Sequence, residues 1–232
     1  VVNIYTRTIT KSSNHPLLDD PYFRRLFNNQ QQRIQSSLGS GVIMQEDGFM
    51  LTNNHVIDGA DQILVLLYDG REARAIVVGK DPETDLAVLK IEADNLQPIS
   101  VGEPAQAQIG DVVLAIGNPY GVGQTVTQGI VSATGRNGLG LNTFENFIQT
   151  DPDINPGNSG GALVDSYGNL LGINTAILNR AGSAGIGFAI PADTAEKVLN
   201  DIISYGYVVR GWLGMDAFPL SQPIAKRLNL PI

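Results

Sequence analysis

Short runs rich in valine and isoleucine, separated by tight turns, constrain the fold of this chain more than any other feature. Short apolar runs between turn residues are typical of buried β-strands. The runs cover residues 41–44, 62–67, 75–78, 86–89, 112–116 and 170–173. The turn signals between them lie at 46–48, 69–70, 117–119 and 167–169. Many short strands joined by tight turns predict an all-β sandwich or barrel.

Two segments depart from this strand pattern. Residues 12–37 are polar, and we expect a long surface loop there, with at most one short helical turn. Residues 191–206 carry apolar side chains at three-and-four spacing, with proline at the start and glycine at the end. This arrangement predicts a helix that packs one face on the sheet. A new apolar and polar stretch follows Arg210, and we expect residues 211–232 to open a further domain.

The charge balance and the lack of cysteine exclude several functions. The chain of 232 residues has 15 basic and 23 acidic residues and a net charge of −8, so we expect no nucleic-acid binding. Without cysteine there is no disulfide, no thiolate-bound zinc, no iron–sulfur cluster and no cysteine nucleophile. Two histidines are too few for a histidine-rich metal site. We expect neither a metal nor an organic cofactor.

Residues 155–161, Asn-Pro-Gly-Asn-Ser-Gly-Gly, carry the strongest functional signal. Acyl transfer needs an exposed hydroxyl and backbone N–H groups that converge on one point. Glycine permits both, because it adopts positive φ and lets a substrate approach the backbone closely. The segment therefore predicts Ser159 as a nucleophile, with the N–H groups of Gly157 and Ser159 as an oxyanion hole.

A serine hydroxyl is a weak nucleophile at neutral pH and needs a base. The two candidates are His15, in a polar turn, and His55, at the end of a strand pattern. We favour His55, because a rigid element positions its ring. Asp85 precedes a buried-looking apolar run, where a carboxylate could orient the imidazole.

The order of His55, Asp85 and Ser159 along the chain matches the chymotrypsin type and differs from the α/β-hydrolase and subtilisin orders. We therefore expect an all-β fold of the chymotrypsin-like kind, a double six-stranded β-barrel with a C-terminal helix. The two barrels would cover about residues 1–97 and 98–210.

Three blocks of the sequence resemble the active-site blocks of the HtrA/Deg serine proteases. They are Thr-Asn-Asn-His-Val at 52–56, Thr-Asp-Leu-Ala-Val at 84–88 and Gly-Asn-Ser-Gly-Gly at 157–161. Further blocks that resemble this family lie at 39–42, 117–119, 148–151 and 185–191. In the same comparison, residues 211–232 resemble the start of the PDZ domain that follows the protease domain in this family.

The resemblance implies an ATP-independent serine endopeptidase of the periplasm that cleaves unfolded or regulatory proteins. It also implies a homotrimer of protease domains and an activating peptide that acts through the PDZ domain. Either the stress-sensor branch or the quality-control branch of the family remains open, as does a membrane anchor before Val1.

The resemblance also points to residues around the triad. Ile154, Leu178 and Ile186 are expected to line an apolar pocket for a small aliphatic side chain of the substrate. Tyr120 and Arg136 lie in segments that resemble loops by which the family switches between resting and active states. We expect them to act in activation rather than in the chemistry.

Two other functions are kept as alternatives. The first is a non-catalytic chaperone or peptide-binding protein on the same scaffold, which would retain its activity in a Ser159→Ala variant. The second is an esterase with the same triad, which would cleave a small ester and leave a protein substrate intact.

Overall fold

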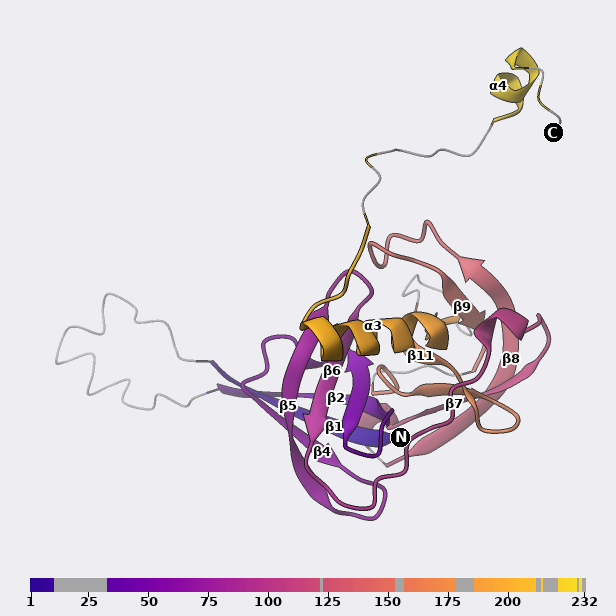
Figure 1. Cartoon of the computed structure of the whole chain (residues 1–232). Coiled ribbons are helices and arrows are strands. Elements are labelled where there is room, and N and C mark those ends of the chain that lie inside the picture. The colour runs from indigo at the N-terminus through magenta and orange to yellow at the C-terminus, as the bar shows by residue number, and fades with distance from the viewer. Residues whose placement is uncertain are drawn as a thin grey trace, which may run out of the picture.

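A computed structural model describes residues 1–10, 33–121, 123–152, 157–177, 186–211, 214, 221–228 and 230. Its strands form two closed six-stranded antiparallel barrels (Figure 1). The first contains β1 (Val2–Thr10), β2 (Arg33–Ile43), β3 (Phe49–Asn53), β4 (Gln62–Leu66), β5 (Glu72–Asp81) and β6 (Leu86–Ile91). The second contains β7 (Val112–Gly117), β8 (Thr125–Arg136), β9 (Phe147–Thr150), β10 (Ala162–Asp165), β11 (Leu170–Ile177) and β12 (Gly187–Pro191). The predicted chymotrypsin-like double barrel is confirmed.

The order of strands around each barrel brings distant segments together. The first closes as β1-β2-β3-β6-β5-β4 and the second as β10-β11-β12-β9-β8-β7. Each of the six apolar runs predicted as strands falls on a strand, namely β2, β4, β5, β6, β7 or β11, and only Met44 and Leu67 lie one residue beyond a strand end. Alternating burial along β4 and β7 is the pattern of strands with one face toward a barrel interior.

The two barrels share one apolar core. A cluster of buried side chains joins β2, β3 and β6 of the first barrel to β9–β12 of the second and to a helix. Its members include Val42, Leu51, Leu86, Phe147, Ala162, Phe188, Val198 and Leu199. Each barrel has its own interior cluster as well. The relative position of the barrels is therefore set by close packing.

The helix in this core is α3 (Ala192–Tyr205), which lies across both barrels in Figure 1. It ends at Gly206, whose φ of 81° is left-handed and whose N–H bonds to the carbonyl of Ile202. Val198 and Leu199 are buried on its inner face. A Cβ at Gly79 of β5 would lie 2.6 Å from Ile202, so glycine is needed for this close approach. The helix predicted over residues 191–206 is confirmed.

The other helical segments among the described residues are short. They are α2 (Asn54–Ile57), the 3₁₀ turns η2 (Pro104–Gln106) and η3 (Pro119–Gly121), and α4 (Gln222–Arg227). No helix in the described ranges is long and apolar enough to span a membrane. The prediction of residues 211–232 as the opening of a PDZ domain stays a prediction.

The loop predicted over residues 12–37 is wrong at its end. Residues 33–37 belong to β2, where they continue the ladder with β1 through the pairs Arg7↔Ser36 and Thr6↔Ser37. Polar residues extend a strand here because backbone hydrogen bonds to a neighbouring strand do not require apolar side chains. Residues 11–32, with His15, lie outside the described residues.

Candidate active site

The first barrel brings His55 and Asp85 together. β3 and β6 are neighbours, and Asn53 at the end of β3 pairs with Leu86 at the start of β6. His55 follows in the helical turn α2, and Asp85 immediately precedes β6. Both side chains therefore leave the same edge of one sheet, although 30 positions separate them in the sequence.

His55 and Asp85 form two contacts. The imidazole Nδ1 of His55 lies 2.7 Å from Oδ2 of Asp85, and the backbone N–H of His55 donates to Oδ1 at 3.0 Å. An ionised carboxylate can only accept, so the proton of the neutral ring belongs on Nδ1. The second nitrogen, Nε2, is then free to accept a proton. The side chain of Asp85 is 14% exposed and that of His55 is 50% exposed, so the imidazole is accessible from solvent.

The backbone of Asp85 is strained and held in place. Its φ is 60°, a left-handed value that few residues other than glycine adopt. The carbonyl oxygen of Asp85 accepts the backbone N–H of Asn54 and the side-chain amide of Asn53, both at 3.0 Å. The segment that carries His55 thus fixes the turn that carries Asp85. Strain that surrounding structure maintains in this way is frequent at functional sites.

Ser159 comes from the second barrel, on the turn before β10. Glycines flank it, Gly157 with φ 106° and Gly160 with φ 81°. A Cβ would lie 2.2 Å from the carbonyl oxygen of Asn118 at Gly157, and 2.2 Å from that of Ser40 at Gly160. Only glycine fits at these two positions, which explains the Gly-Asn-Ser-Gly spacing in the sequence.

The hydroxyl of Ser159 is not directed at the base. It donates to the backbone carbonyl of Thr175 on β11 at 3.1 Å. Within the described part of the chain, no hydrogen bond joins Ser159 to His55. Catalytic hydrogen bonds are often long or unformed without substrate.

Thr175 connects the two halves of the site, and sequence reasoning missed it. Its hydroxyl donates to Oδ2 of Asp85 at 2.9 Å, while its carbonyl accepts from Ser159. Thr175 is buried and lies at an irregularity of the β11–β12 ladder, between Asn174 and Ala176. Its run of apolar and polar residues carries no signal that would distinguish it from any other strand threonine.

The residues expected around the triad are placed only in part. Ile154 and Leu178 lie outside the described residues. Ile186 is half-buried and packs against the core that the barrels share. Tyr120 belongs to the turn η3. Arg136 ends β8 and donates from Nε to the side-chain oxygen of Gln149 on β9 at 2.8 Å.

The loop after Arg136 reaches the turn of Asp85. The side-chain amide of Asn142 donates to the carbonyl of Thr84, and the N–H of Phe144 donates to that of Glu83, both at 3.0 Å. Glu145 organises the loop by accepting backbone N–H groups, including that of Leu139 at 2.6 Å. Burial acts to raise the pKa of Glu145, but these backbone donors outweigh it and lower that pKa.

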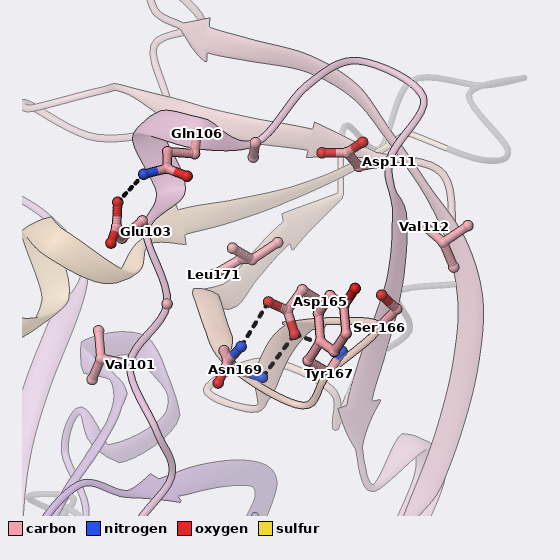
Figure 2. A pocket seen from close by; sticks show the side chains of 12 residues that line it. Val101, Glu103, Gln106, Asp111, Val112, Asp165, Ser166, Tyr167, Asn169 and Leu171 are labelled. Atoms are coloured by element: carbon pink, nitrogen blue, oxygen red, sulfur yellow. Dashed lines mark hydrogen bonds between the residues drawn. The ribbon is translucent and has the colours of Figure 1, made fainter.

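A cavity of about 500 Å³ lies elsewhere on the second barrel (Figure 2). Residues of 101–112 and 165–171 line it, and none of the residues expected in the site is among them. Figure 2 shows the carboxylate of Asp165 bonded to Asn169 and Tyr167 in its own turn. Burial acts to raise the pKa of Asp165, but these hydrogen bonds outweigh burial and lower that pKa.

Across the described ranges, no group of three or more His, Asp or Glu side chains could hold a metal.

Comparison with known proteins agrees with this geometry. Residues 39–173 match the trypsin-like peptidase domain family. Serine endoprotease DegS of Escherichia coli K12 is 51% identical over 206 residues, which are 86% of this chain and 58% of that protein. A probable periplasmic serine endoprotease, DegP-like, of Chlamydia trachomatis is 47% identical over 220 residues, 91% of this chain and 44% of that protein. The chain thus spans about half the length of these relatives.

Solved structures extend the likeness to the whole chain. The HtrA-type protease AlgW with decapeptide has a TM-score of 0.81 and 58% sequence identity, and the match covers 99% of this chain and 72% of that one. A serine endoprotease from Yersinia pestis has a TM-score of 0.73 and 48% identity, over 93% of this chain and 66% of that one. The double barrel and this extent of identity together show that the chain belongs to the HtrA/Deg family of trypsin-like serine proteases.

Proposed function

We propose that the protein is a serine endopeptidase that cleaves unfolded or regulatory proteins without ATP. The observation that carries the proposal is the oriented pair of His55 and Asp85 beside a serine on a glycine turn. Their contact at 2.7 Å leaves Nε2 of His55 as a free base, and Thr175 links Asp85 to Ser159. A binding scaffold would need none of these contacts.

The proposed reaction begins when Ser159 attacks the carbonyl carbon of a peptide bond. His55 takes the hydroxyl proton on Nε2 and later gives it to the leaving amine. Asp85 stays ionised, holds the ring and stabilises the imidazolium. The N–H groups of Gly157 and Ser159 bind the oxyanion of the tetrahedral intermediate. Water, activated by His55, then releases the acyl group from Ser159.

We extend the proposal to specificity and control. Ile154, Leu178 and Ile186 would line an apolar pocket for a small aliphatic side chain. Tyr120 and Arg136 would act in activation, which the contact of the loop after Arg136 with the turn of Asp85 supports. The resting position of the Ser159 hydroxyl on Thr175 fits an enzyme that needs activation.

The cellular setting is proposed from the relatives. Several are named periplasmic serine endoproteases, and we place this protein in the periplasm, in envelope quality control or stress signalling. An inner-membrane anchor before Val1, a homotrimeric assembly and an activating peptide bound by a following PDZ domain are the finer parts of this proposal. Residues 211–232 would be the start of that domain.

Labelling with a fluorophosphonate, followed by peptide mass spectrometry, tests the proposal. We expect modification at Ser159, together with cleavage of an unfolded protein substrate without ATP. Ser159→Ala should lose both. Ser166→Ala is the matched control, because Ser166 is exposed in the cavity of Figure 2, and it should keep both.

Three results would contradict the assignment. Proteolysis that persists in folded Ser159→Ala would show that another group is the nucleophile. A Ser159→Ala variant that keeps every biological activity of the protein would favour the chaperone. Cleavage of small esters with protein substrates left intact would favour the esterase.

A further inference from the structure

Ser40 of the first barrel contacts the proposed oxyanion segment of the second. It lies on β2 and is completely buried. Its N–H donates to the carbonyl of Ser159 at 2.8 Å, and its hydroxyl donates to the carbonyl of Gly157 at 2.7 Å. The hydroxyl also accepts the N–H of Asn118 at 3.0 Å. A single residue therefore holds both ends of the Gly157–Ser159 segment.

Three consecutive carbonyls of this segment are held by hydrogen bonds. Those of Gly157 and Ser159 bond to Ser40, and that of Asn158 accepts the N–H of Gly161 at 2.9 Å. A trans peptide unit is planar, so its N–H points opposite to its C=O. Fixing the carbonyl of Asn158 therefore fixes the N–H of Ser159. The hydrogen bonds to the carbonyls of Gly157 and Ser159 prevent the two adjacent peptide units from rotating.

This segment needs such anchors because of its glycines. Gly157 and Gly160 have φ values of 106° and 81°, and glycine populates both signs of φ with little difference in energy. A peptide unit next to glycine can therefore turn over easily and withdraw an N–H from the oxyanion. Ser40 is itself fixed, because its carbonyl accepts the hydroxyl of Thr52 at 2.7 Å.

The hydroxyl of Ser40 holds the carbonyl of Gly157, whereas its backbone N–H holds only the carbonyl of Ser159. In an alanine variant the N–H of residue 40 would still hold Ser159. Gly157 would keep only the N–H of Asn118, at 3.4 Å. Asn118 belongs to the turn that continues into η3, so the hydroxyl also ties the oxyanion segment to the turn that contains Tyr120.

We propose that Ser40 is a positioning residue of the reaction, whose buried hydroxyl holds the peptide unit before that of Ser159 and so helps keep the N–H of Ser159 directed at the oxyanion. The inference rests on the proposed function, since it concerns the oxyanion hole of the same site. It adds a residue from the first barrel to a hole built from the second.

Ser40→Ala tests this role through the division between kcat and KM. We expect kcat for a peptide substrate to fall about 10- to 100-fold with KM nearly unchanged. Loss of a complete oxyanion donor costs about 10²–10³ in kcat, and a misdirected donor should cost less. The affinity for a peptide boronate, which mimics the tetrahedral intermediate, should fall by the same factor as kcat.

A matched control separates positioning from stability. Ile91→Val removes one methylene from the completely buried core of the first barrel, and it should lower the melting temperature while kcat stays at the wild-type value. If Ser40→Ala does not fold, Ser40→Cys keeps a weak donor of similar shape, and kcat and boronate affinity should fall together in that variant.

Wild-type kcat in folded Ser40→Ala would overturn the inference, as would a loss of kcat with unchanged boronate affinity. Fluorophosphonate labelling of the wild-type protein distinguishes these failures from failure of the proposed function. If the wild type is labelled at Ser159 and Ser40→Ala is labelled at the same rate, the inference about Ser40 alone is wrong. If Ser159 of the wild type is not the labelled residue, the proposed site itself is wrong.

Discussion

Replacing Thr175 by valine should slow catalysis without moving any triad residue. Among the described residues, the hydroxyl of Thr175 is one of three donors to the Asp85 carboxylate, beside Nδ1 and the backbone N–H of His55. Valine has nearly the same shape, so the substitution leaves no cavity. The Asp85 side chain is 14% exposed, and water can replace the lost donor only in part.

The expected size of the effect follows from that single bond. A hydrogen bond to a charged group contributes about 1.5–3 kcal/mol, and each 1.4 kcal/mol changes a rate about tenfold. The full value would reduce kcat/KM about 10- to 150-fold. Only the part of the bond that strengthens when His55 becomes charged affects the barrier. We therefore expect a decrease of about tenfold for Thr175→Val.

The assay is kcat/KM for a small ester and for a peptide, measured beside Thr175→Ser. Serine keeps the hydroxyl and loses only a methyl group, so its activity should stay within a few-fold of the wild type. Wild-type kcat/KM in Thr175→Val would show that this bond does not orient Asp85. Equal impairment of both variants would assign the effect to packing instead.

Two further predictions concern the glycine turn and the loop of Glu145. Gly160→Ala should unfold far more easily than Gly70→Ala, as thermal melting would show. Both glycines have a left-handed φ, which costs a residue with a Cβ about 1–2 kcal/mol. A Cβ at Gly160 would lie 2.2 Å from the carbonyl oxygen of Ser40, whereas a Cβ at Gly70 would meet nothing within 4 Å. Equal melting temperatures of the two variants would refute the importance of this contact. The pKa of Glu145 is lowered from 4.5, so its stabilisation of the loop is complete above that pH and is lost as the pH falls through the lowered value. Amide-exchange protection at Leu139 should decrease in that range and already at pH 7 in Glu145→Gln, and full protection in that variant would contradict the role of the carboxylate.

The barrel strands could be predicted because buried strands require runs of apolar residues that are visible in the local sequence. The run 86–89 lies in β6, where side chains on both faces of the strand are buried. The run 112–116 lies in β7, where the side chains alternate between buried and more exposed positions. Residues 33–37 could not be predicted in the same way. Their strand is defined by pairing with β1, and a ladder partner across a long insertion leaves no periodic pattern of its own.

The residues of the candidate site also differ in whether the sequence alone could indicate them. His55, Asp85 and Ser159 were proposed from the sequence because the chemistry of a serine protease requires particular residue types in a particular chain order. Thr175 and Ser40 were not, because each acts through a contact made by the fold. Thr175 lies 90 positions from Asp85, and Ser40 lies 117 positions from Gly157. The residues next to Thr175 and Ser40 in the sequence do not indicate that these side chains contact Asp85 and Gly157.

The division of the site between two barrels explains which contacts are formed in the structure. His55 and Asp85 both belong to the β3–β6 edge of the first barrel, so their contact does not depend on how the barrels meet. The contacts of Ser40 with Gly157 and of Thr175 with Asp85 cross from one barrel to the other. The hydroxyl of Ser159 bonds within its own barrel, to Thr175.

A shift of one barrel against the other would therefore leave the contact between His55 and Asp85 intact while changing the positions of Ser159 and of the Gly157–Ser159 segment. The shared core resists such a shift, because closely packed interiors have few alternative arrangements. A switch in this protease should consequently act on the crossing contacts rather than on the His55–Asp85 pair. The loop after Arg136, which bonds to the turn of Asp85 from the second barrel, is in a position to do so.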